Sequence, residues 1–214
     1  MHYYFFNYIF IGIINLGYKY PVNISMKQED YFAKIKVDAT NLMDSCNKWM
    51  TQFPDLIYTY RTDSDSLVDV ADTPDKEFDK SFRTFDMWHP ELNYTLASNN
   101  FLKKLHKKFP INNIAINNFH PNFYYRLHTD WRRGVAINML ISGTDSHCLF
   151  VDDTHFIELD YKPGEMYLFN TQKPHTITNF SEQRTLFSIQ FVEGKDTLSY
   201  NMIYDYLKNN GLVD

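Results

Sequence analysis

The sequence is poor in the residues that mark several large classes of protein. Its 214 residues include only 2 cysteines, 7 glycines and 8 prolines. Cys46 and Cys148 are far apart and form no CxxC pair, which argues against a zinc ribbon or a disulfide scaffold and favours a reducing, cytoplasmic setting. The low glycine and proline content argues against a collagen-like or low-complexity chain. Because 44% of the residues are hydrophobic and 17% are aromatic, we expect a buried core.

An excess of positive charge is also missing. The chain has 26 acidic and 21 basic residues, a formal net charge of -5, so it has no general attraction for nucleic acid or anionic membranes. Lys103, Lys104, Lys107 and Lys108 are close together, but such runs are typical of a solvated helix face. We therefore expect neither nucleic acid nor a membrane as a partner, and the sequence leaves the oligomeric state open.

No apolar run is long enough to span a bilayer, which needs about 20 residues. Residues 3–16 are strongly apolar, yet only His2 stands before them where a secretory signal would carry Lys or Arg. We predict that residues 1–25 form an apolar arm, whose role the sequence leaves open, and that residues 26–214 form a single domain. The frequent Asn, Ile, Lys, Tyr and Phe suggest an AT-rich genome, such as that of a virus.

The first half of the chain contains two helix patterns. Apolar residues recur every three or four positions over residues 38–53, and Pro54 follows, which predicts an amphipathic helix covering a sheet. Residues 92–109 predict a second helix that ends before Pro110. Residues 56–60 indicate a short strand, and the acidic stretch at 63–79 indicates a loop.

From residue 111 to about residue 195 the pattern changes to a series of short β-prone runs. About eight such runs follow one another, separated by Gly, Pro, Asn and Asp and without intervening helices. Helices followed by many strands predict an α+β fold. We expect a cupin-like jelly roll, or double-stranded β-helix, with the N-terminal helices packed outside.

Two histidines and an aspartate are the best candidates for a metal site. His128 and Asp130 are two residues apart, so on a strand their side chains point to the same side. With His175, 47 residues later, they could form the facial set of two histidines and one carboxylate that binds iron in non-haem oxygenases. An HxD triplet is weak evidence alone. The rival pair His89 and Glu91 flanks a proline, and we interpret it as a surface turn.

The surroundings of His175 make the pattern more specific. Gly164 begins the run GEMYLFNTQKPHTITN, which predicts strand, tight loop and strand, and Arg184 follows His175 by 9 residues. This order resembles the Fe(II)/2-oxoglutarate-dependent dioxygenases, which have an HxD motif, a distant histidine and then an arginine or lysine. The resemblance covers roughly residues 117–191 and is most similar to the aspartyl/asparaginyl β-hydroxylase-like branch. The best-known members of that branch lack the carboxylate ligand that Asp130 provides here.

The resemblance implies a role for each residue. His128, Asp130 and His175 would bind Fe(II), and Arg184 would pair with the distal carboxylate of 2-oxoglutarate through its planar guanidinium. Asn138 on a following strand would help to hold the co-substrate, or would be satisfied by the backbone. Tyr124 and Arg126 share strand parity with His128, so we expect both to face the co-substrate. A salt bridge at the barrel mouth is an equal alternative for Arg126.

The implied function is hydroxylation of an amino acid or of a peptide or protein side chain. It would consume O2 and 2-oxoglutarate and release succinate and CO2, with the protein orienting the substrate. Nucleic-acid demethylases of this superfamily carry a further arginine where this chain has Gln190, which argues against base repair. Two alternatives are a cupin-like metalloenzyme that does not use 2-oxoglutarate, and a non-catalytic jelly-roll module for binding or for a virion.

Overall fold

The computed structural model describes residues 27–54, 58–60, 85–86, 90–122, 124–152 and 155–214. The arm predicted at residues 1–25 and the loop predicted at residues 63–79 lie outside these ranges. Within the described part of the chain, every helix is too short or too polar to cross a bilayer. The described elements are η1 (Gln28–Asp30), β1 (Phe32–Ile35), α2 (Thr40–Gln52), β2 (Tyr58–Tyr60), β3 (Phe85–Asp86), α4 (Pro90–Ser98), α5 (Asn100–Lys108), β4 (Ile111–Phe119), β5 (Tyr124–His128), β6 (Ala136–Ser142), β7 (Ser146–Asp152), β8 (His155–Leu159), β9 (Met166–Phe169), β10 (His175–Asn179), β11 (Arg184–Phe191) and α6 (Tyr200–Asn209).

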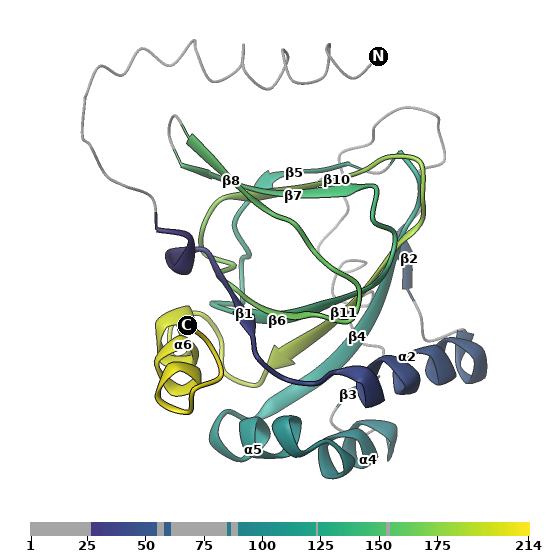
Figure 1. Cartoon of the computed structure of the whole chain (residues 1–214), viewed down its shortest axis with the longest axis vertical. Coiled ribbons are helices and arrows are strands. Elements are labelled where there is room, and N and C mark those ends of the chain that lie inside the picture. The colour runs from purple at the N-terminus through teal and green to yellow at the C-terminus, as the bar shows by residue number, and fades with distance from the viewer. Residues whose placement is uncertain (1–26, 55–57, 61–84, 87–89, 123, 153–154) are drawn as a thin grey trace.

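The eight strands β4 to β11 coincide with the eight β-prone runs of the sequence. They form two sheets that face each other (Figure 1). The major sheet has the strand order β1-β9-β6-β11-β4-β2, with β3 also paired to β4, and the minor sheet has the order β5-β10-β7-β8. All pairings between the described strands are antiparallel except that of β2 with β4.

The chain passes back and forth between the two sheets. β4 lies in the major sheet, β5 in the minor sheet, β6 in the major sheet, β7 and β8 in the minor sheet, and β9, β10 and β11 alternate again. This winding of antiparallel strands defines a jelly roll of the double-stranded β-helix type. The predicted fold class is confirmed.

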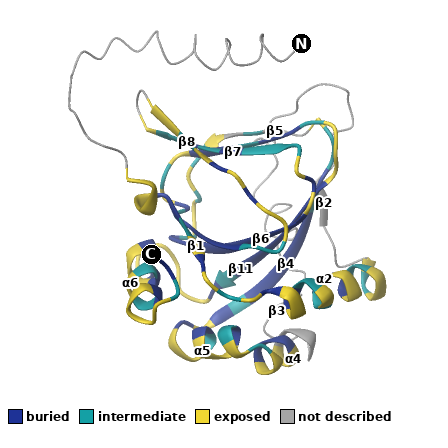
Figure 2. Ribbon diagram, in the orientation of Figure 1, coloured by how far each residue is buried: buried dark blue, intermediate teal, exposed yellow. Residues whose placement is uncertain are grey.

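Alternate residues of the major sheet belong to two different environments, because successive side chains of a strand point to opposite faces. Its outer face is apolar and packs against the helices through Ile114, Ile116, Ile137, Met139, Phe187 and Ile189. Its inner face looks toward the minor sheet and carries the buried polar residues Asn117, Asn138 and Ser188. Figure 2 shows the buried strands of this sheet between the minor sheet and the partly exposed helices.

The helices pack on the outer face of the major sheet, as predicted. α2 matches the predicted helix at residues 38–53, and its buried Leu42, Cys46 and Trp49 join the core beneath the sheet. The single helix predicted at residues 92–109 is wrong, because two helices, α4 and α5, occupy this stretch. Asn99 between them has an extended backbone, and its side chain accepts a hydrogen bond from the backbone N–H of Leu102 at 3.0 Å. An N-cap of this kind begins a new helix.

Four described elements, η1, β1, β3 and α6, have no counterpart in the sequence predictions. β1 extends the major sheet beside β9, where Phe32 pairs with Phe169. α6 packs against the same outer core through Tyr200, Ile203 and Leu207. The predicted surface turn at Pro90 and Glu91 is also wrong, because these residues begin α4, where proline is favoured at the first helical position. His89 lies outside the described residues.

Candidate metal centre and co-substrate pocket

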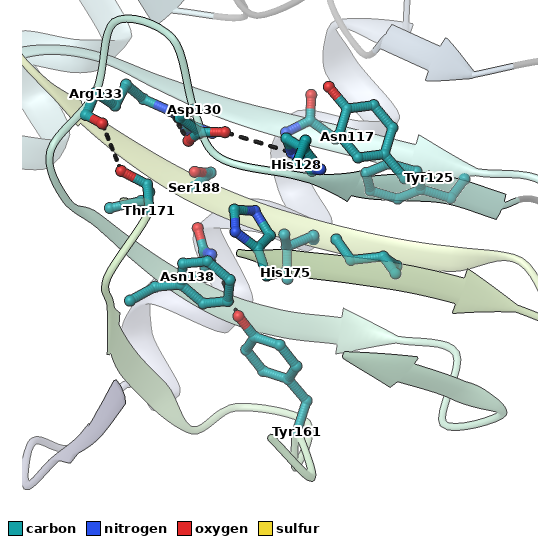
Figure 3. Close-up of a pocket in the computed structure, with 15 residues that line it drawn as sticks. Asn117, Tyr125, His128, Asp130, Arg133, Asn138, Tyr161, Thr171, His175 and Ser188 are labelled. Atoms are coloured by element: carbon teal, nitrogen blue, oxygen red, sulfur yellow. Dashed lines mark hydrogen bonds and ion pairs between the residues drawn. The ribbon is translucent and has the colours of Figure 1, made fainter. Parts of the chain in front are cut away.

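The three predicted metal ligands come together at one end of the minor sheet. β5 and β10 are neighbouring antiparallel strands, and His128 pairs directly with His175. Asp130 follows β5 on the same side (Figure 3). The candidate ligand atoms of His128, Asp130 and His175 all lie within 4.8 Å of one another. Two imidazoles and one carboxylate are the donor set expected for non-haem Fe(II).

His175 is prepared to act as a neutral ligand. The residue is 4% exposed, and burial lowers its pKa from 6.5 to about 4 against the attraction of Asp130. Its Nδ1 lies 2.9 Å from the carbonyl oxygen of Lys173. Since a carbonyl can only accept, Nδ1 carries the proton and Nε2 is left as the donor atom for a metal.

Asp130 is held as a carboxylate by its neighbours. Burial alone would raise its pKa, but the guanidinium of Arg133 and the nearby imidazoles outweigh burial and hold the pKa well below its usual range. Arg133 donates from Nε to Oδ2 at 2.8 Å, and its Nη2 lies 2.7 Å from the same oxygen. Oδ1 lies 3.5 Å from Nε2 of His128. One carboxylate oxygen therefore faces the histidines while the other is bound by the arginine.

A pocket between the two sheets leads inward from this site. Its wall combines aromatic and aliphatic side chains with polar groups from both sheets, which is the usual character of a small-molecule site. It is lined by Asn117, Phe119, Tyr125, His128, Asp130, Arg133, Ala136, Asn138, Tyr161, Phe169, Thr171, His175, Ile177, Leu186 and Ser188. The ligand set and the predicted co-substrate residue Asn138 thus share one pocket (Figure 3).

A register shift in β5 changes which of its residues reach the pocket. His128 pairs with His175, but Tyr125 pairs with Ile177, so one extra residue is accommodated in β5. Tyr125 therefore lines the pocket and contacts the His128 ring at 4.1 Å between centroids. Strand parity counted from His128 could not reveal this. The side chains of Tyr124 and Arg126 lie outside the described part of the structure, and their predicted roles stay predictions.

Asn138 lies on the inner face of the major sheet, next to a buried tyrosine. Its Nδ2 donates to the hydroxyl of Tyr161 at 3.2 Å. Its Oδ1 is buried and has no hydrogen-bond partner among the described residues, and the same holds for Oδ1 of Asn117. Tyr161 and Asn117 were missed by the sequence analysis, because neither belongs to a spaced motif. The unpaired Oδ1 atoms of Asn117 and Asn138 and the hydroxyl of Tyr161 are polar groups with which this part of the pocket could bind a polar ligand.

Arg184 begins β11 and is the least usual side chain of the core. It is 1% exposed, and its Nε, Nη1 and Nη2 have no hydrogen-bond partner within the described structure. Its guanidinium lies 5.4 Å from the ring of Phe119 and 5.2 Å from that of Tyr161, two residues that line the pocket. Burial lowers its pKa. A buried guanidinium with only ring contacts is costly unless an anion completes it.

Gly143 allows the chain to approach the start of β11 closely. Its φ is +87°, and a Cβ at this position would lie 2.4 Å from the carbonyl oxygen of Gln183 and 2.6 Å from Cα of Arg184. Only glycine fits both the conformation and the space. The turn after β6 therefore packs directly on the backbone that carries Arg184.

The residues after Asp130 form the rim of the site. Trp131 is 66% exposed, and the guanidinium of Arg132 lies 4.4 Å from its ring centroid. Because Trp131, Arg132 and Arg133 directly follow the HxD motif, their sequence fits either a substrate contact or an exposed basic turn. Trp131 is on the exposed rim, whereas Arg133 turns inward to Asp130.

No protein-family model matches the sequence, and no characterised protein matches it by sequence. Solved structures match the fold at low identity. An oxidoreductase of the 2OG-Fe(II) oxygenase family from Burkholderia pseudomallei is 12% identical with a TM-score of 0.41, over 49% of this chain and 56% of that chain. A prolyl-4-hydroxylase from Pseudomonas putida is 12% identical with a TM-score of 0.46, over 76% and 92%. A Trichoplax adhaerens prolyl hydroxylase, solved with a hypoxia inducible factor peptide, is 10% identical with a TM-score of 0.48, over 75% and 82%.

Proposed function

We propose that the protein is a non-haem Fe(II)- and 2-oxoglutarate-dependent dioxygenase that hydroxylates an amino acid or a peptide or protein side chain. The observation that carries this proposal is the buried, unpaired guanidinium of Arg184 beside a pocket whose other end holds two histidines and an aspartate. A metal site alone would fit many jelly-roll proteins. The Arg184 guanidinium, next to the pocket residues Phe119 and Tyr161, would add the second site, for an anion, that a dicarboxylate co-substrate requires.

The ligand set fits Fe(II). His128, Asp130 and His175 would hold the ion on one side and leave its other positions open. When bound, iron and 2-oxoglutarate together activate O2, with release of succinate and CO2 and transfer of one oxygen atom to a substrate C–H bond. The chain supplies two imidazole donors and a carboxylate that Arg133 keeps ionised.

The co-substrate would lie between the metal and Arg184. Its distal carboxylate would replace the missing partners of the Arg184 guanidinium with charge-assisted hydrogen bonds. Tyr161 contacts Arg184 through its ring and Asn138 through its hydroxyl, so both side chains are suited to hold the same carboxylate. Their place along the pocket wall supports the predicted role of Asn138.

The substrate would reach the metal from the rim. The exposed indole of Trp131 and the guanidinium of Arg132 stand beside the residue that carries the metal carboxylate, where a small molecule or a peptide could contact them. The assignment to the aspartyl/asparaginyl hydroxylase-like branch stays a prediction, since none of the structures named above is described as such an enzyme.

The decisive experiment is anaerobic reconstitution with Fe(II) and 2-oxoglutarate. We expect a visible absorption band from the iron chelate of 2-oxoglutarate, followed by succinate formation when O2 is admitted. His128→Ala, Asp130→Ala and His175→Ala should each abolish the band. Arg184→Met should retain metal binding and lose the band at 2-oxoglutarate concentrations that saturate the wild type.

The same experiment separates the alternatives. A cupin-like enzyme that does not use 2-oxoglutarate would bind metal and give neither band nor succinate. A non-catalytic jelly roll would bind no stoichiometric metal. Wild-type protein that is shown to be metal-loaded and yet produces no succinate would contradict the proposal.

A further inference from the structure

Two loops next to the metal ligands are joined by a set of neutral hydrogen bonds. One loop follows β5 and carries Asp130, and the other connects β9 to β10 and leads to His175. The backbone N–H of Asp130 donates to the carbonyl of Thr171 at 2.9 Å. In return, the hydroxyl of Thr171 donates to the carbonyl of Arg133 at 2.6 Å. The dashed line between Thr171 and Arg133 in Figure 3 marks this contact.

Gln172 adds two further bonds between the same loops. Its Nε2 donates to the carbonyl of Asp130 at 2.8 Å and to the carbonyl of Arg133 at 2.6 Å. Gln172 is an exposed residue, so its side chain contributes little buried apolar area to the core. Fixing an exposed glutamine costs side-chain entropy. Its ordered place is therefore explained by the two carbonyls that it joins.

The hydrogen bonds connect backbone segments that carry different ligands. Asp130 is itself bonded by Gln172, and His175 lies only three residues beyond Gln172. The His175 ring is fixed by the carbonyl of Lys173, which belongs to the same loop. The bonds of Thr171 and Gln172 therefore join the backbone that carries the carboxylate to the loop that leads to the imidazole, in addition to the pairing of β5 with β10.

We propose that Thr171 and Gln172 are positioning residues that lock the loop of Asp130 to the loop of His175 before the metal binds. This inference rests on the proposed metal site. Without these hydrogen bonds, the two loops would become ordered only when the ion binds. The loss of conformational entropy would then weaken the metal affinity. Partners of this kind, which orient metal ligands without touching the metal, typically change metal affinity by about 10–100-fold when they are removed.

The test is a calorimetric titration of the metal-free protein with Co(II), which needs neither activity nor a known substrate. Gln172→Met removes both amide bonds at an exposed position, and we expect it to weaken Co(II) binding about tenfold. Thr171→Val removes the hydroxyl while keeping the shape, with a similar expected loss. Thr171→Ser restores the hydroxyl and should bind Co(II) within about threefold of the wild type.

Gln52→Met is the matched control, because Gln52 is an exposed glutamine at the end of α2, outside both loops. It should leave the Co(II) affinity unchanged. Because the two bonds of Gln172 also order the metal-free protein, the thermal midpoint of metal-free Gln172→Met should lie a few degrees below that of Gln52→Met, and a much larger fall would indicate a general loss of stability. With saturating Co(II), 2-oxoglutarate should bind Gln172→Met within about threefold of the wild type, because the lock acts on metal loading.

The outcomes distinguish this inference from the proposed function. Wild-type protein that binds Co(II), together with Gln172→Met that binds it equally well, would overturn the lock and leave the metal site intact. Wild-type protein that binds no Co(II) would overturn both. If Thr171→Val does not fold, the exposed Gln172→Met decides alone.

Discussion

The two faces of the major sheet are built from the same strands and have opposite chemistry. In β11, Phe187 and Ile189 face the helices and belong to the outer core, whereas Arg184 and Ser188 are buried on the inner side. The outer face has the apolar contacts that stabilise a fold. The inner face retains polar atoms without partners, which lowers stability, and the candidate pocket lies on this face. Because successive side chains of a strand point to opposite faces, residues that stabilise the core and residues that line the pocket are neighbours in the sequence.

The largest effect on stability is expected on the outer face. Phe187 is 0% exposed, and Phe187→Ala removes a ring from a packed core, so we expect the free energy of unfolding to fall by about 3–5 kcal/mol. Ser188→Ala, one residue along on the inner face, should change it by less than about 1 kcal/mol. Urea unfolding of both variants measures the contrast. Equal losses in the free energy of unfolding would show that the inner and outer faces contribute equally to stability.

The next effect has the opposite sign. Arg184→Met replaces a buried, unpaired cation by an apolar side chain, so we expect the free energy of unfolding to rise by about 1–3 kcal/mol. The variant should also lose the rise in melting temperature that 2-oxoglutarate produces in the metal-loaded wild type. Lys103→Met, on the exposed side of α5, is the control and should change neither quantity. A loss of stability in Arg184→Met would mean that the guanidinium has a structural partner.

A smaller effect is expected at the pocket wall. Asn138→Leu removes the bond to Tyr161 together with the unpaired Oδ1, and these two changes nearly cancel, so stability should stay within about 1 kcal/mol of the wild type. The affinity for 2-oxoglutarate should fall about tenfold, since roughly one charge-assisted hydrogen bond is lost. Titration of the visible iron band measures this affinity. An unchanged affinity for 2-oxoglutarate would show that Asn138 has only a structural role.

The smallest effect on stability is expected at the rim. Trp131 is 66% exposed, and Trp131→Ala should change the free energy of unfolding by less than about 0.5 kcal/mol. Binding of the iron and 2-oxoglutarate should also be unchanged, because Trp131 does not line the pocket. Thermal unfolding and the same iron band test these expectations. A substantial loss of stability would show that Trp131 packs on the fold and is no free substrate contact.

Local sequence signals predicted a large part of the fold. Each of the eight strands from Ile111 to Phe191 contains enough β-prone residues, and enough turn residues at its ends, to be identified by itself. The helix at Thr40–Gln52 was visible from its apolar spacing. The break at Asn99 was missed because the apolar pattern continues through it, although a capping side chain ends one helix and begins another.

The site was predicted less evenly. The candidate metal ligands followed from the HxD parity and the context of His175. Tyr125 could not be found from parity, because a one-residue bulge in β5 is invisible in the alternation. Thr171 and Gln172 gave no signal either, since their partners are backbone carbonyls of another loop.

The sequence by itself determined which segments are strands and which side chains share a strand face, because propensity and two-residue alternation are local properties of the chain. It also determined that His128, Asp130, His175 and Arg184 follow one another at a suggestive spacing. Only the tertiary structure decided that β5 lies beside β10, so that the two histidines meet, and that Arg184 is buried without a partner. Strand pairing, register shifts and burial depend on contacts between distant segments, and those contacts created the pocket.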